Sequence, residues 1–402
     1  MEKSIYDEKY KKLNKAIDAL VVEEEVLEEA DDKNKKYRIG SQFLSFIMRE
    51  MKKARPKSHL ANSIVYPNGS DKNKILITIS KSDMIKMALE FFEDLDRELY
   101  IKVMRLLIDI NDKEVLKIYN YHDVEDFDGK DEQGFANFEE TTVRYTEKGR
   151  NRIYLVLMED MESSEASFLK RTIESEAICT YEDLFKLVHE IAHGFDKDED
   201  FGLDRKEILS KKTEARLPKT AETFLSETTA IFFEQLLADY LVNKNPNLKV
   251  ISDQVTKSRI STNSNMVNAT GIKAALLNER KNILATSPRI LDQIFEFYGV
   301  NKDKVIDAII EEPSMYEERK YAFAELLVPS MIKKYREGPV AGRDKIKEYL
   351  RQVRDNNFAG ALAVWDISFT KKGFETLIKN MKEYEQSYIY EFKDIDYSRE
   401  ER

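Results

Sequence analysis

The segment from residue 181 to residue 194 constrains the fold most, because its sequence fits a helix that must be buried on one side. Acidic residues occupy the expected first turn, where a helix favours negative charge. Apolar residues recur at helical spacing and form a stripe: Leu184, Leu187, Val188 and Ile191. His189 and His193 are four residues apart and therefore project from one face. We expect a partly buried helix that directs two imidazoles at a common point.

The residues around these histidines form the pattern His-Glu-x-x-His, with Glu190 directly after the first histidine. Two imidazoles on one face can share a metal ion, and Glu190 leaves the helix at a different angle, beside the ion. This arrangement is typical of zinc hydrolases, in which the glutamate acts as general base. The chain has 4 His among 402 residues, so two of them at this spacing favour a zinc site over a chance pattern.

A catalytic zinc ion needs a third protein ligand, and a glutamate on a later helix is a common one. Residues 224–241 are expected to form a second amphipathic helix, with Glu227 near its start. Glu234 lies seven residues later on the same face, and Glu222 lies five residues earlier. Spacing alone leaves all three glutamates as candidates for the third ligand.

The scarcity of glycine and proline, with 13 and 8 residues, favours long helices over a β-sandwich. The chain is expected to be helical from residue 287 to residue 385, with breaks near Pro313, Gly338 and Asn356. The polar stretch 245–285 is expected to be irregular, a loop plus a helix.

Two short runs rich in strand-forming residues, 141–145 and 152–157, flank a turn and predict a β-hairpin just before the helix with the histidines. An extended peptide commonly pairs with a sheet edge beside the metal of a zinc peptidase, although a hairpin that only covers the core fits equally well. The predicted fold class is therefore mainly α, a large helical protein with a small antiparallel β-sheet beside the metal helix.

Charge and hydropathy argue against several classes of partner. The net charge of −10 disfavours nucleic acid, because phosphate binding needs a basic face. The sequence has no run of 18 or more apolar residues, so no membrane span is expected. Its first residues lack the apolar run of a signal peptide, and its single cysteine, Cys179, fits a reducing compartment. We expect a cytoplasmic protein.

Three segments resemble the thimet oligopeptidase and oligoendopeptidase F family of zinc peptidases. Residues 181–194 resemble the metal helix of this family. Residues 224–234 resemble the helix that carries the third ligand, and this similarity selects Glu227. Residues 321–338 are similar to the late helix with a tyrosine that binds substrate and transition state. The resemblance covers about residues 95–385.

The resemblance implies a zinc-peptidase fold and a zinc-dependent oligoendopeptidase that hydrolyses internal bonds of short unstructured peptides. The implied catalytic residues are Glu190, Tyr321 and Tyr316, and the implied zinc ligands are His189, His193 and Glu227. The implied domains are an N-terminal helical region (1–95), a catalytic domain (96–386) and a charged tail (387–402).

The chain departs from the family pattern at three places. Ala192 stands where the family usually has glycine, and Ala230 replaces a serine that often follows the third ligand. Residues 309–316 contain no histidine, whereas the family usually has one before the late tyrosine. The metal ligands are intact, but the residues that stabilise the transition state are changed. An alternative interpretation is therefore a zinc-binding protein with reduced catalysis that binds peptides or has a regulatory role.

Overall fold

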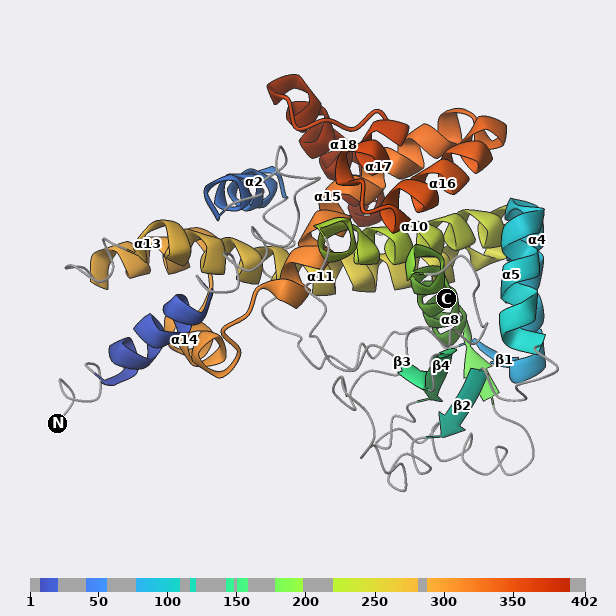
Figure 1. Cartoon of the computed structure of the whole chain (residues 1–402), viewed down its shortest axis with the longest axis horizontal. Coiled ribbons are helices and arrows are strands. Elements are labelled where there is room, and N and C mark those ends of the chain that lie inside the picture. Colours follow the sequence, from blue (N-terminus) through green and yellow to red (C-terminus); the bar gives the residue numbers. More distant parts are fainter. Residues whose placement is uncertain are drawn as a thin grey trace, which may run out of the picture. The chain divides into compact units, whose positions relative to one another are not determined.

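The structure, a computed structural model, describes the chain at residues 8–20, 41–55, 77–108, 116–120, 142–147, 150–157, 178–197, 220–280 and 288–390. Within these residues the chain is mainly helical (Figure 1), in agreement with the predicted class of a large helical protein. None of the described helices is long and apolar enough to cross a membrane.

The chain forms two compact units, and each is assembled from segments that are distant in the sequence. Unit 1 comprises Met1–Asp71, Leu217–Thr228 and Thr256–Arg402, and unit 2 comprises Lys72–Arg216 and Thr229–Val255. Two helices pass from one unit to the other, namely α10 (Thr220–Lys244) and α11 (Lys249–Asn278). These two units do not coincide with the predicted domains 1–95, 96–386 and 387–402. The domain boundaries stay predictions.

The regular secondary structure described in unit 1 is entirely helical. Besides a helix over 8–20 and its parts of α10 and α11, it contains α2 (Ser41–Ala54), α13 (Pro288–Tyr298), α14 (Lys302–Glu311), α15 (Tyr316–Glu337), α16 (Pro339–Arg354), α17 (Phe358–Val364) and α18 (Lys371–Tyr390). The predicted breaks are confirmed, because Pro313, Gly338 and Asn356 each lie between two helices. Helix α18 continues to Tyr390, so the predicted tail 387–402 begins inside it.

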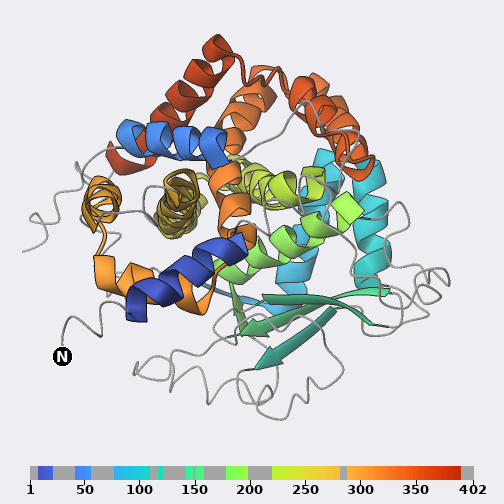
Figure 2. The ribbon, with the colours of Figure 1, turned by 60° about the vertical axis from the view of Figure 1, so that its left-hand side comes forward.

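Helix α15 is central to unit 1 because its middle part is buried on all sides. Every residue from Ala322 to Ile332 is buried. The helix packs against α16 and α18, and α2 lies against α18 (Figure 2). Phe323 of α15 contacts Phe224 of α10, with ring centroids 4.8 Å apart. Burial of such aromatic side chains contributes roughly 1.5–3 kcal/mol each, which fixes α15 in the core.

The helix predicted within 245–285 is present as α11, but the expectation of irregular structure is wrong, because α11 runs for 30 residues. Its polar side chains find partners without ending the helix. The hydroxyls of Ser264 and Thr262 each donate to the carbonyl oxygen four residues earlier. Asn263 donates to Oε1 of Glu325 on α15 at 2.8 Å. Residue types that favour turns when exposed are therefore accommodated in a packed helix.

Unit 2 combines helices with short strands. Besides its parts of α10 and α11, it contains β1 (Thr78–Ser80), α4 (Lys81–Leu95), α5 (Arg97–Ile108), β2 (Leu116–Asn120), β3 (Thr142–Glu147), β4 (Arg150–Leu157), β5 (Ile178–Thr180), α8 (Tyr181–Lys197) and a 3₁₀ turn (Pro246–Leu248). Strand β4 pairs antiparallel with β3 and parallel with β2, and β1 pairs antiparallel with β5.

The helices of unit 2 pack through aromatic side chains. Helix α8 lies against α4 and contacts β3, β4 and β5. Between ring centroids, Phe92 of α4 lies 5.7 Å from Phe195 of α8 and 6.0 Å from Phe233 of α10. This shared apolar contact holds α8 between two other helices, and α8 is the helix that carries the paired histidines.

Candidate metal centre

Helix α8 begins at a fixed point, because Thr180 and Asp183 cap each other. The backbone N–H of Thr180 donates to Oδ2 of Asp183 at 2.7 Å, and the backbone N–H of Asp183 donates to Oγ1 of Thr180 at 3.2 Å. Asp183 is buried, and this burial raises the pKa of its carboxyl. The predicted apolar stripe is fully buried: Leu184, Leu187, Val188 and Ile191. The cap and the stripe together determine which face of α8 carries the histidines.

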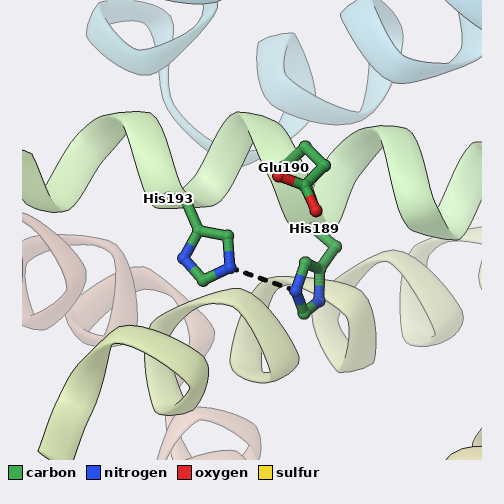
Figure 3. Close-up of side chains that lie close together, drawn as sticks. All are labelled: His189, Glu190 and His193. Carbon is green, nitrogen blue, oxygen red and sulfur yellow. Dashed lines mark hydrogen bonds between the residues drawn. The ribbon is translucent and has the colours of Figure 1, made fainter. Parts of the chain in front are cut away.

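His189 and His193 project from one face of α8 toward each other (Figure 3). Their Nε2 atoms are 3.1 Å apart, and their ring planes are at 82°. Glu190 leaves the helix next to His189, and one carboxylate oxygen lies within 4.8 Å of the histidine nitrogens. The structure therefore brings together the three residues that the sequence pattern predicted to share a site.

The spacing of the two nitrogens fits a shared ion. A tetrahedral zinc ion with Zn–N bonds near 2.0–2.1 Å separates two ligand nitrogens by about 3.3 Å. The observed separation of 3.1 Å between the Nε2 atoms is close to that value. Imidazole nitrogens are borderline-soft donors that suit zinc among the common divalent metals. Both the distance and the donor type are thus compatible with zinc.

Glu234 of α10 holds the outer side of His189. Its Oε1 lies 2.5 Å from Nδ1 of His189, and the two side chains are 11% and 15% exposed. An Nδ1–H that donates to this carboxylate leaves the lone pair of Nε2 directed toward His193. Carboxylates in this position orient metal-binding histidines and raise their basicity. Glu234 was one of three candidates for the third ligand, and the structure places it against Nδ1 of His189, whereas Nε2 of His189 lies near His193.

This partnership was not predicted from the sequence. The available signal was the general rule that a metal-binding histidine donates its second N–H to a carboxylate or carbonyl. Spacing along one helix cannot reveal it, because Glu234 and His189 are 45 residues apart. Only the packing of α10 against α8 within unit 2 selects Glu234.

Glu227 is also on α10, seven residues before Glu234 and therefore on the same face. Its side chain is 5% exposed. It belongs to unit 1, whereas the histidines belong to unit 2, and among the described residues the metal-binding group consists of His189, Glu190 and His193. The assignment of Glu227 as third ligand stays a prediction. The side chain of Glu222 lies outside the described residues.

Tyr316 and Tyr321 both lie in the first part of α15 in unit 1. Tyr321 is partly buried, and the side chain of Tyr316 lies outside the described residues. Their predicted role as donors to the transition state therefore stays a prediction.

No known family model matches the chain, and neither does a curated protein or a solved structure. The resemblance to zinc peptidases therefore rests on the sequence segments and stays a prediction.

Proposed function

We propose that this protein is a zinc-dependent oligoendopeptidase that hydrolyses internal bonds of short unstructured peptides. One observation carries the proposal. The Nε2 atoms of His189 and His193 lie 3.1 Å apart, while Nδ1 of His189 lies 2.5 Å from Oε1 of Glu234. A histidine pair with one member oriented by a carboxylate recurs in catalytic zinc sites, where a third protein ligand completes the set.

The proposed zinc ligands are His189, His193 and Glu227. When bound, zinc supplies a Lewis acid and lowers the pKa of a water molecule to about 7. Glu227 enters the proposal through the sequence resemblance and through its buried position on α10, the helix that also carries Glu234. Its carboxylate would complete a set of two imidazoles and one carboxylate.

Glu190 acts as the general base in this proposal. Its carboxylate lies within 4.8 Å of the histidine nitrogens and is only partly buried, so it can reach a water molecule at the site. It takes the proton of the attacking water and returns it to the leaving amine as the C–N bond breaks. A positioned base of this kind typically contributes 10²–10⁴-fold to the rate.

Glu234 keeps His189 in the tautomer that binds metal. Its charge-assisted hydrogen bond to Nδ1–H is among the strongest types in proteins, and it is partly shielded from water. Tyr321, with Tyr316 as the second candidate, would donate to the oxyanion of the transition state. Loss of one such donor typically costs 10²–10³-fold in kcat.

An extended peptide is proposed to bind along the small sheet next to α8. Among the described strands, the three-stranded sheet has the order β2-β4-β3, so β3 lies at its edge with β4 as its antiparallel partner. Helix α8 contacts both strands. Backbone pairing at such an edge recognises a peptide with little demand on its sequence, which suits an enzyme for varied short peptides. On the basis of the single cysteine, we place the protein in the cytoplasm.

The proposal is tested with a library of quenched fluorescent peptides and zinc-loaded protein. We expect the wild type to cleave peptides and Glu190→Gln to be inactive while it still binds about one zinc ion per chain. Glu182→Gln, on the same helix and outside the site, is the matched control and should keep wild-type activity. Zinc binding without cleavage by the wild type would reject the peptidase and favour a zinc-binding protein with reduced catalysis.

A further inference from the structure

Lys273 of α11 is a buried lysine of unit 1 that has no part in the zinc chemistry proposed above. Its Nζ donates to the carbonyl oxygen of Ser314 and to Oε1 of Glu318. The side chains of Lys273 and Glu318 are 5% and 18% exposed. One ammonium group, the Lys273 contact, therefore binds both the residues just before α15 and the first turn of α15.

The first turns of α15 differ from its middle in what holds them. Packing fixes the middle of the helix, where every residue from Ala322 to Ile332 is buried. The first turns carry three consecutive charged residues, 318–320, and a partly buried Tyr321. Met315 occupies the N-cap position, and methionine lacks the side-chain oxygen that usually holds the first N–H groups of a helix. Polar contacts such as the Lys273 contact therefore help to decide where these turns lie.

A shielded ion pair of this kind is better suited to fixing a position than to adding stability. Removing an ammonium group and a carboxylate from water offsets much of their attraction, so an apolar pair of similar volume is often equally stable. A lysine near the start of a helix also opposes the helix dipole. In contrast, charge-assisted hydrogen bonds are short and directional, so they hold Ser314 and Glu318 at a defined place on α11.

The start of α15 also packs on the part of α10 that carries Glu227, and all of these residues belong to unit 1. The Arg319 guanidinium lies over the ring of Phe224, 5.6 Å from its centroid. Phe224 and Glu227 are three residues apart and are therefore neighbours on α10. Glu318 and Tyr321 are neighbours on α15 for the same reason. A shift of the first turns of α15 would thus move Tyr321 relative to the turn of α10 that carries Glu227.

We propose that Lys273 is a positioning residue for peptide hydrolysis, an inference that rests on the proposed function. Through Ser314 and Glu318 it fixes the start of α15 on α11, and it thereby holds Tyr321 where that residue donates to the oxyanion. Lys273 acts through α15 and contacts neither the substrate nor the metal. A displacement of about 1 Å in a reacting group can cost about 10²-fold in rate, so loss of the Lys273 contact should lower kcat without abolishing turnover.

The first test is the kinetics of peptide cleavage by the zinc-loaded full chain. We expect Lys273→Met to lower kcat about 10–100-fold with little change in KM and with the zinc content of the wild type. Lys257→Met, at an exposed position of α11 in unit 1, is the matched control and should behave like the wild type. If the wild type cleaves peptides and Lys273→Met has the same kcat, the positioning role is overturned.

A double variant separates an effect through Tyr321 from a general loss of structure. If Lys273 acts through Tyr321, Lys273→Met combined with Tyr321→Phe should have the kcat of Tyr321→Phe alone. Two losses that multiply would overturn the proposal, because Lys273 would then act independently of Tyr321. Glu318→Gln keeps the size of its side chain and should lower kcat in the same direction but less, so it replaces Lys273→Met in the cycle if that variant does not fold.

Hydrogen–deuterium exchange tests the Lys273 contact without any measurement of activity. At the start of α15 the backbone N–H of Arg319 donates to the carbonyl oxygen of Met315 at 3.1 Å. We expect faster exchange at residues 319–321 in Lys273→Met than in the wild type, and unchanged exchange at residues 322–332. Equal exchange at 319–321 would overturn the proposal. Faster exchange there, with a wild type that cleaves no peptide, would instead reject the proposed function and leave the Lys273 contact with a purely structural role.

Discussion

Replacing Arg55 with methionine is expected to lower the free energy of unfolding by about 3–5 kcal/mol, the cost of leaving a buried charge without its partner. Arg55 directly follows α2, and its Nε donates to Oε1 of Glu385 on α18 at 2.9 Å. Its Nη2 lies 3.8 Å from Oε2 of Glu325 on α15. The three side chains are 4%, 0% and 3% exposed, so solvent cannot take over the role of the missing cation.

The size of this loss follows from burial rather than from the number of ion pairs. Removal of Arg55 leaves the Glu385 carboxylate in the interior, and a typical protein has only about 5–15 kcal/mol of stability in total. Replacing both partners, Arg55→Met with Glu385→Leu, should recover most of the loss, because an apolar pair of similar volume often matches a buried ion pair. Arg351 pairs with Glu348 on the surface of α16, so Arg351→Met should change stability far less.

Urea unfolding followed by tryptophan fluorescence measures the stability of unit 1, the unit that contains Arg55. Trp365 is the only tryptophan of the chain, is 1% exposed and belongs to unit 1, as does Arg55. We expect a lower urea midpoint for Arg55→Met and a midpoint near that of the wild type for Arg351→Met. Equal midpoints for the two variants would refute the argument that the buried cluster stabilises unit 1.

Three further predictions concern a buried lysine and the proposed site. Burial, followed by the charge of Arg55, lowers the pKa of Lys52 from 10.5 to about 8. Between these pH values the unfolded chain holds this proton and the folded chain does not, so stability rises with pH. In urea titrations the wild type should therefore gain roughly 3 kcal/mol over Lys52→Met across this window, and a constant difference would contradict the shift. Glu234→Gln should weaken zinc binding about 10–100-fold in competition with a chelator, and an unchanged affinity would remove its role in orienting His189. Tyr321→Phe should lower kcat for peptides about 10²–10³-fold with little change in KM, and a wild-type kcat would transfer the role to Tyr316.

The helix with the histidines could be predicted because its signals are local. A stripe of apolar residues, acidic residues in the first turn and the spacing of His189 and His193 all act within about five turns of one helix. The structure adds the cap between Thr180 and Asp183, which follows the same local chemistry. Local signals also located the breaks at Pro313 and Gly338, since proline and glycine interrupt helices through their own backbones.

The remaining features depend on contacts between distant segments. The contact between Nδ1 of His189 and Glu234 depends on how α10 packs on α8. The sequence around Glu234 contains no local signal that predicts this contact. The full length of α11 was not predicted, because its serine, threonine and asparagine residues favour turns when solvated, whereas here Asn263 bonds to Glu325 on another helix. Tertiary packing overrides such weak local preferences, and it also decides the division into two units.

The most direct test of the proposed metal site is a zinc titration against a chromophoric chelator, with each of the four histidines replaced by alanine in turn. The chain has only His59, His122, His189 and His193, so the set is complete. We predict about one zinc ion per chain for the wild type and for the variants at His59 and His122, with zinc binding lost in His189→Ala and His193→Ala. Retention of zinc by His193→Ala, or a wild type that binds none, would contradict the account.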